Sequence, residues 1–249
     1  MKRRLDQQSG FTLMELMIVV LILSLLVWPF LEGVQRVRFE AKRELSASRL
    51  NAAKQVLLNF VRVNAFLPCP DGSRDGFEDR DGSGRCKYAS GHLPYREVLV
   101  SPLQLKDAWG NEFIYAIDAS ALDGGLIQNS GSSAAYFARD GAPRFSLRTP
   151  PNALLEAENG FIICRANGGD CDDSRAELHS ISAVVMAANK RGIGSSFSSC
   201  SSSTLWEKEN CDGDRYLVSG GYVKDLFDDQ LVVISAYEIK AQLLSVWGL

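Results

Sequence analysis

The sequence lacks the residue patterns on which most catalytic sites depend. It has only two histidines, His92 and His179, and its six cysteines include no C-x-x-C pair, so a zinc site is not expected. The segment 192–196 does not follow the Gly-x-Ser-x-Gly pattern of hydrolases, and no phosphate-binding glycine loop occurs. These absences argue against an enzyme, and we expect the two histidines to be a loop residue and a strand-edge residue.

A strong charge of either sign is also absent. The chain carries 27 basic and 30 acidic side chains, for a formal net charge of −3. Binding to nucleic acid without sequence preference depends on a basic surface that neutralises phosphates. The composition therefore does not indicate nucleic acid as a partner.

One long apolar run stands out near the amino terminus. Residues 11–31 contain a single ionisable side chain, Glu15, and are long enough to cross a bilayer as a helix. A secretory signal peptide would be cut after such a run, next to small residues, but residues 28–30 are Trp, Pro and Phe. The small residue suited to processing is Gly10, before the run. We therefore expect the apolar helix to stay in the mature protein.

At this junction the chain reads Gly10-Phe11-Thr12-Leu13-Met14-Glu15-Leu16. The heptapeptide resembles the processing motif of type IV pilins and type II secretion pseudopilins. The resemblance implies that residues 1–10 are a leader peptide, that a prepilin peptidase cuts after Gly10, and that the new terminus, Phe11, is N-methylated. It also implies an inner-membrane protein with a cytoplasmic amino terminus and a periplasmic head. The implied partners are other pilin-like subunits, the peptidase, an inner-membrane assembly platform and membrane lipid.

The acid inside the apolar run has a physical reading of its own. A carboxylate at the centre of a bilayer costs roughly 2.5–3.5 kcal/mol on insertion scales, so it needs a partner. Cleavage after Gly10 creates a cationic amine at Phe11, four residues before Glu15. We predict that Glu15 of one subunit pairs with the Phe11 amine of a neighbour and sets the axial register, as buried polar groups do in coiled coils. The alternative is a Glu15 that lies at the headgroup level without such a role.

Beyond the apolar run, the predicted fold class is α+β and pilin-like. Residues 32–66 have apolar positions at steps of three, four and seven, which predicts an extramembrane half of the first helix that ends at Leu67-Pro68-Cys69-Pro70. Residues 67–249 form the head, with a closing helix at 237–246. Short β-branched and aromatic segments predict a mostly antiparallel sheet with strands at 112–118, 134–138, 160–166, 181–187, 215–219 and 230–235.

Several head segments extend the resemblance. Residues 107–115, DAWGNEFIY, are similar to the D-x-W-G-N turn and following strand of major pseudopilins. Leu67-Pro68-Cys69-Pro70-Asp71, Gly91-His92-Leu93-Pro94, Glu209-Asn210 and Phe227-Asp228-Asp229 resemble large minor-pilin-like proteins. Together with the length of the chain, these segments suggest a minor subunit.

All six cysteines follow the apolar run. An even number confined to one side suggests disulfides in an oxidising compartment. Six cysteines allow 15 pairings, and the sequence leaves them open. We prefer pairs of sequence neighbours, because each pair flanks a loop rich in Gly, Asp and Ser: Cys69–Cys86, Cys164–Cys171 and Cys200–Cys211.

Two acidic segments are candidates for calcium. The first is the loop 71–84. The stretch that starts at Asp79 begins like an EF-hand loop, but Ser90 occupies the position of the bidentate glutamate. The second segment is favoured by the resemblance, because major pseudopilins bind calcium in a late loop of the head; its acids are Glu207, Glu209, Asp212, Asp214, Asp225, Asp228 and Asp229. The alternative for both is a solvated acidic loop, and no other cofactor is expected.

The sequence thus predicts a minor pilin or pseudopilin subunit that is built into, or primes or caps, a type IV pilus or a type II secretion pseudopilus. A second hypothesis is a single-span anchored binding protein or adhesin that never assembles. A third is a tethered periplasmic enzyme, which the missing catalytic patterns disfavour.

Overall fold

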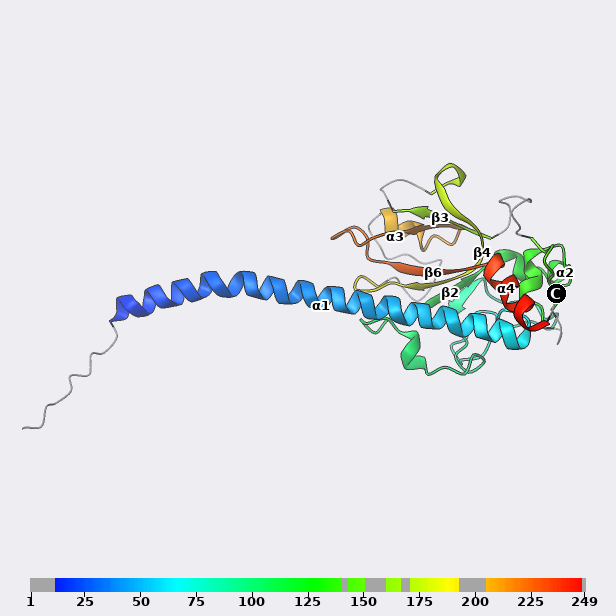
Figure 1. Cartoon of the computed structure of the whole chain (residues 1–249), viewed down its shortest axis with the longest axis horizontal. Coiled ribbons are helices and arrows are strands. Elements are labelled where there is room, and N and C mark those ends of the chain that lie inside the picture. The colour runs from blue at the N-terminus through cyan, green and yellow to red at the C-terminus, as the bar shows by residue number, and fades with distance from the viewer. Residues whose placement is uncertain (1–11, 140–142, 151–159, 167–170, 193–204, 248–249) are drawn as a thin grey trace, which may run out of the picture. The chain divides into compact units, whose positions relative to one another are not determined.

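The computed structural model describes residues 12–139, 143–150, 160–166, 171–192 and 205–247, without the side chains of residues 26–32, 180, 205, 245 and 247. The chain divides into two compact units, Met1–Lys42 and Arg43–Leu249. Helix α1, Leu13–Asn64, contributes to both units (Figure 1). The second unit contains the last part of α1 together with the sheet, and we call it the head.

Within the first unit, α1 continues through Pro29 and Gly33 without a break. Neither residue therefore ends the helix. The side chains of residues 12–25 are all exposed in this unit. The helix therefore presents its apolar side chains outward over this stretch.

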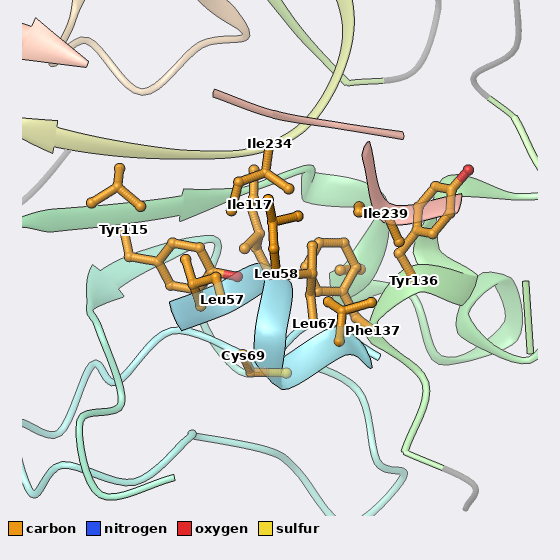
Figure 2. Close-up of a cluster of buried hydrophobic side chains, with 14 of the residues drawn as sticks. Leu57, Leu58, Leu67, Cys69, Tyr115, Ile117, Tyr136, Phe137, Ile234 and Ile239 are labelled. Atoms are coloured by element: carbon orange, nitrogen blue, oxygen red, sulfur yellow. The ribbon is translucent and has the colours of Figure 1, made fainter. Parts of the chain in front are cut away.

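Within the head, α1 is held by one apolar face. Its buried side chains recur at steps of three and four, as a helix that packs on one side requires, and they include Leu50, Leu57 and Val61. Figure 2 shows Leu57 and Leu58 of α1 beside Tyr115 and Ile117 of the sheet. The hydroxyl of the fully buried Tyr115 donates to the Pro68 carbonyl oxygen at 3.0 Å, so this polar atom is satisfied in the core.

The sheet of the described residues has six strands: β1 (Ser90–His92), β2 (Ile114–Ile117), β3 (Phe161–Arg165), β4 (Ala176–Ala187), β5 (Tyr216–Ser219) and β6 (Gln230–Ser235). Their order is β1-β2-β4-β3-β5, and β6 also pairs with β4. All pairs are antiparallel except β3–β5. The predicted class, a long helix with a mostly antiparallel sheet, is confirmed.

The closing helix is also confirmed. Helix α4 spans Ala236–Trp247 and starts directly after β6. Its buried side chains Ile239 and Leu243 join the same core as α1, and Figure 2 places Ile239 near Tyr136 and Ile234. Lys54 of α1 forms an ion pair with Glu238 of α4, with Nζ and Oε1 2.5 Å apart. The two helices are thereby linked by both packing and charge.

The strand predicted at 134–138 is wrong, because this segment forms a 3-10 helix, Ser133–Phe137. Ser132 caps it by accepting a hydrogen bond from the Ala134 N–H, and the Ser133 hydroxyl donates to the buried Asp118. All five residues of the turn are buried, so the sequence shows an apolar run without the alternation that separates strand from helix.

Strand β1 was not predicted, since its residues Ser-Gly-His are short and polar. It is held by pairing with β2 and by the isolated bridge between Asp71 and His92. Gly91 lies so close to the Asp71 carbonyl that a Cβ would sit 2.6 Å from its oxygen. Backbone approach, not apolar side chains, therefore builds this strand.

Two disulfides join sequence neighbours, as the spacing favoured. They are Cys69–Cys86 and Cys164–Cys171. Cys211 is disulfide-bonded as well. Its predicted partner, Cys200, lies outside the described residues, so the third pairing stays a prediction.

The remaining helical turns of the described residues are short. They are η1 (Pro102–Leu105), η2 (Ala119–Leu122), α2 (Gly124–Ile127), η4 (Asp173–Arg175) and α3 (Leu205–Glu209). Of these, α3 matters most for the site below, because it carries Glu207.

Candidate functional site

The start of helix α1 is a capping box formed by Thr12 and Glu15. The backbone N–H and the hydroxyl of Thr12 both donate to Oε2 of Glu15 at 3.0 Å. The backbone N–H of Glu15 donates in return to the Thr12 hydroxyl oxygen at 3.3 Å. These bonds satisfy donors that the first turn of a helix leaves without partners. Oε1 of this exposed carboxylate has no partner among the described residues.

The other predicted processing residues, Gly10 and Phe11, lie outside the described residues, as does the predicted leader 1–10. Among the residues that the structure describes, no helix is both long enough and apolar enough to cross a membrane. The predicted span, 11–31, includes Phe11 and the side chains from residue 26 onward, which are not described.

In the head, three buried carboxylates meet. Glu207 comes from α3, and Asp228 and Asp229 lie directly before β6. One oxygen of each lies within 4.8 Å of the others, and the three residues are only 2%, 3% and 2% exposed. Buried acids are rare unless they are paired or bind a cation. We call these three residues the acid cluster.

The acid cluster is tied to a turn that follows β4. The Arg191 guanidinium donates through Nη1 to Oε2 of Glu207 at 2.9 Å, and the Arg191 backbone N–H donates to Oδ2 of Asp228 at 3.3 Å. The Asp228 backbone N–H donates to Oε1 of Glu207 at 3.2 Å. Among the described residues, the Arg191 guanidinium is thus a positive charge bonded directly to the acid cluster.

Two buried asparagines complete the surroundings. The Asn210 side-chain amide donates to Oδ2 of Asp229 at 3.0 Å, and its oxygen accepts from the Val218 N–H at 2.7 Å. The Asn189 side-chain amide donates to the Asp228 carbonyl oxygen at 2.6 Å. Both asparagines are fully buried, so the acid cluster lies in a region shielded from water.

Burial shifts the pKa values of the two aspartates of the acid cluster. Burial raises the pKa of Asp228 to about 6, and the neighbouring Glu207 adds to the shift, while contacts with Arg191 oppose it. Burial also raises the pKa of Asp229 well above its usual value, against the hydrogen bond from Asn210. The charged forms of Asp228 and Asp229 are therefore disfavoured in this buried environment, and a bound cation would favour them.

The donor set of the acid cluster fits a hard cation. Oδ1 of Asp228 and Oδ1 of Asp229 are buried and have no hydrogen-bond partner among the described residues, and the same holds for the side-chain oxygen of Asn189. Calcium prefers six to eight carboxylate, carbonyl and amide oxygens. The residues present would supply the carboxylate part of such a shell.

The other acids of the predicted late calcium set lie outside the acid cluster. Oε1 of Glu209 accepts from the Cys171 N–H at 3.1 Å. Asp212 and Asp214 are exposed and organise a turn, with Oδ1 of Asp214 accepting from the Tyr216 N–H at 2.7 Å. Asp225 is exposed, and its carbonyl oxygen accepts from Arg191.

The acidic loop 71–84 uses its carboxylates to build itself. The buried Asp71 accepts from the backbone N–H groups of Arg74 and Gly76 at 2.6 and 2.7 Å. Asp79 accepts from two further backbone amides of the loop. The other acids of the loop also have protein partners. Glu78 forms ion pairs with Arg80 and with Arg139, which lies outside the loop. Asp75 accepts from the Phe77 N–H, and Asp81 forms an ion pair with Arg85. Within the described residues, no group of metal-ligating side chains forms here.

The two histidines have separate surroundings. His92 lies in β1 with Nδ1 3.5 Å from Oε2 of Glu112, and burial lowers its pKa. His179 is exposed on β4. Neither joins a group of three metal-ligating residues among those described.

Sequence reasoning missed Asn189 and Arg191 altogether. Nothing in the local sequence marks them, because their role depends on the turn after β4, where Asn189 has a positive φ of 50°. Asn210 and Asp229 did belong to segments that carried the resemblance, and the structure brings these two segments together at 3.0 Å.

Comparison with known proteins locates one match. Residues 5–31 match the family described as "Prokaryotic N-terminal methylation motif". The chain therefore carries the signature of type IV pilins and pseudopilins in front of, and within, its long first helix. No curated protein and no solved structure matches the chain.

Proposed function

We propose that this chain is a minor pilin or pseudopilin subunit that is processed after Gly10 and assembled into a type IV pilus or a type II secretion pseudopilus. The observation that carries the proposal is the methylation motif at residues 5–31, followed by a long helix and a mostly antiparallel head. A chain of this design needs its apolar helix after processing, and the proposed cut after Gly10 would leave that helix in the mature protein. The proposed role is structural, either as a component of the fibre or as the subunit that primes or caps it.

The proposal assigns the two parts of the chain to two places. Residues 11–31 would anchor the subunit in the inner membrane until a platform moves it into the fibre, with lipid and then other subunits as neighbours. The disulfides of the head suit an oxidising compartment such as the periplasm. The prepilin peptidase would act on the cytoplasmic side, where the basic leader remains.

The capping box sharpens the proposed role of Glu15. Its Oε2 is used by Thr12 of the same helix, whereas Oε1 has no partner among the described residues. One carboxylate can therefore cap its own helix and still accept the methylated amine of a neighbouring Phe11. Such a pair would fix the axial position of one apolar helix against another.

The test is intact-mass analysis of the native protein together with recovery of fibres. We expect a mass that lacks residues 1–10 and carries one added methyl group. Glu15→Ala should leave membrane insertion unchanged and strongly reduce incorporation into fibres. An unprocessed Met1 start, or a cut beyond residue 31, would contradict the proposal.

A single-span adhesin or binding protein is the second candidate. Its sequence basis is the same apolar run with a large head, and it differs in never entering a fibre. Normal incorporation of the Glu15→Ala variant, or a processed protein that stays in the membrane while fibres form, would favour this candidate.

We further propose that the acid cluster binds a divalent cation, with calcium as the expected ion. The supporting observations are the buried oxygens of Asp228 and Asp229, which have no hydrogen-bond partner among the described residues, and the closeness of three buried acids. When bound, the ion would supply the missing positive charge and stabilise the folded head by linkage. At a concentration one hundred times its dissociation constant this amounts to about 2.7 kcal/mol.

The melting temperature of the processed full-length protein in detergent micelles tests the cation proposal. Calcium should raise it relative to chelator, and Glu207→Gln should remove most of the difference. Glu209→Gln is the matched control, since Glu209 lies on the same short helix but outside the acid cluster. A transition that calcium leaves unchanged in the unsubstituted protein would contradict the proposal.

A further inference from the structure

Helix α1 is held to the head at a turn formed by residues 106–111. Nη1 of Arg49 donates to the carbonyl oxygens of Lys106 and Asp107, each at 3.0 Å. The hydroxyl oxygen of the fully buried Ser46 accepts from the Ala108 N–H at 2.9 Å. These contacts link two successive turns of α1 to one loop. We call residues 106–111 the docking turn.

The docking turn is organised by its own first acid. Oδ1 of the buried Asp107 accepts from the backbone N–H groups of Trp109 and Asn111, both at 2.8 Å. Oδ2 accepts from the side-chain amide of Asn111 at 2.8 Å. Asn111 therefore determines whether both carboxylate oxygens are used, and Gly110 supplies the positive φ of 97° that the turn needs.

Asn111 also reaches out of the docking turn. The same side-chain amide donates to the Asn189 carbonyl oxygen at 2.6 Å. The side chain of Asn189 in turn donates to the Asp228 carbonyl oxygen at 2.6 Å and to Oε1 of Gln230 at 3.2 Å. A series of hydrogen bonds, most of them partly buried, therefore connects α1 to the acid cluster through the docking turn and Asn189.

Asp228 belongs both to the acid cluster and to the hydrogen bonds that lead to the docking turn. Its backbone carbonyl holds Asn189, while its side chain lies in the acid cluster, where it accepts from the Arg191 N–H. Its backbone N–H is bonded to Glu207. A displacement of Asp228 that relieves repulsion among the carboxylates would therefore also disturb Asn189, which is fully buried and has a strained positive φ.

We infer that the acid cluster controls how firmly the head holds helix α1, through Asp228, Asn189 and the docking turn. When the charge of the cluster is balanced, Asp228 stays in place and the docking turn keeps its bonds to Ser46 and Arg49. When the charge is unbalanced, the turn loosens. The inference goes beyond the proposed function: it needs neither fibre assembly nor a particular cation.

Hydrogen exchange measured by mass spectrometry tests this coupling in the processed full-length protein in detergent micelles, at one pH and with chelator present. The reporter is the peptide that covers the docking turn, because the Ala108 amide hydrogen is bonded to Ser46. Glu207→Ala removes acceptors from Arg191 and Asp228, and we expect exchange in the docking turn to become about fivefold faster. Glu207→Gln keeps an acceptor and removes one negative charge, so exchange in the docking turn should become slower than in the unsubstituted protein.

A double-mutant cycle separates coupling from general loosening. Asn111→Ala cuts the connection, so adding Glu207→Ala to it should change exchange in the docking turn by less than about twofold. Glu209→Ala, on the same short helix, should change nothing there. Should Glu207→Ala destabilise the whole head, which peptides from β2 and β4 would reveal, Asp228→Asn replaces it; this variant removes one charge and should slow exchange in the docking turn.

Unchanged exchange in both cluster variants would overturn the inference, and so would effects of Glu207→Ala and Asn111→Ala that simply multiply. Either result leaves the processing and fibre assays untouched, so the two proposals fail separately. If calcium did not raise the melting temperature but the double-mutant cycle still showed coupling, only the cation proposal would be overturned.

Discussion

Helices α1 and α4 begin with the same reciprocal hydrogen bonds in different surroundings. At α4, the backbone N–H and the hydroxyl of Ser235 donate to Oε2 of Glu238, and the Glu238 N–H donates back to Ser235. This repeats the arrangement of Thr12 and Glu15 at α1. The other oxygen of Glu238 pairs with Lys54, whereas that of Glu15 has no partner among the described residues.

The difference shows how one local motif serves two purposes. A capping box is set by residues three positions apart and needs nothing from the rest of the fold. What the second oxygen does depends on the neighbours that tertiary structure or assembly supplies. In α4 the neighbour belongs to the same head, and in α1 the proposed neighbour belongs to another subunit.

The largest effect is expected from a change that removes the proposed neighbour. Gly10→Ile places a β-branched side chain where the resemblance requires a small residue, so processing should stop and residues 1–10 should remain in the intact mass. Without a free Phe11 amine, fibre incorporation should fall to background. The head should melt at an unchanged temperature, and Ser9→Ala should be processed normally.

The next effect separates capping from pairing in α1. Glu15→Gln keeps an oxygen that can accept from Thr12 but loses the charge that would hold a cationic amine. We expect incorporation into fibres to drop at least about tenfold, which corresponds to about 1.4 kcal/mol, with helix content by circular dichroism unchanged. Normal incorporation of this variant would mean that Glu15 acts only as a cap.

In α4, the corresponding substitutions of Glu238 should change the stability of the head and not the assembly of fibres. Glu238→Ala removes the cap acceptor and the Lys54 partner, and should lower the unfolding free energy of the head by about 1–2 kcal/mol. Glu238→Gln keeps the acceptor and should cost only about 0.5 kcal/mol, because the pair is partly exposed to solvent. Equal losses for the two variants, in denaturant titrations, would show that capping contributes nothing here.

The smallest effect concerns pH. Although burial alone would raise it, the hydrogen bonds from Lys54 and Ser235 lower the pKa of Glu238. A carboxyl whose pKa is lower in the folded state stabilises the fold above its unfolded pKa, near 4.3, and loses this contribution as the pH falls through the folded value. The melting temperature of the head should therefore decline less steeply below about pH 4.3 in Glu238→Gln than in the unsubstituted protein.

Periodicity was enough to predict most elements of the fold. The strands at 230–235 and 160–166 have β-branched patterns, and the closing helix has an amphipathic one. Turn residues precede 230–235 and lie on both sides of 160–166. The strand prediction at 134–138 was wrong because a continuous apolar run does not distinguish a buried strand from a buried 3-10 helix, which is what residues 133–137 form. Strand β1 could not be predicted from the sequence, because it forms by pairing with β2 and not through a pattern in its own side chains.

The two candidate sites differ in the same way. The processing motif lies in one contiguous stretch, so the sequence alone contains it. The acid cluster joins residues about twenty positions apart, and its contacts with Asn189 and Arg191 depend on a turn that only the folded sheet defines. Composition could mark the late segment as acidic, but it could not select Glu207, Asp228 and Asp229 over their exposed neighbours.

Strand β4 has a consequence for how the head is made. Its twelve residues pair with β2, β3 and β6, which come from well-separated parts of the chain. Pairing over such separations is slow, because each loop must close before its contacts are gained. Since β6 is the last of the described strands along the chain, one edge of β4 would stay uncovered in a nascent head until β6 has been synthesised. Pairing of β6 with β4 is therefore the event that ends this exposure to misassembly.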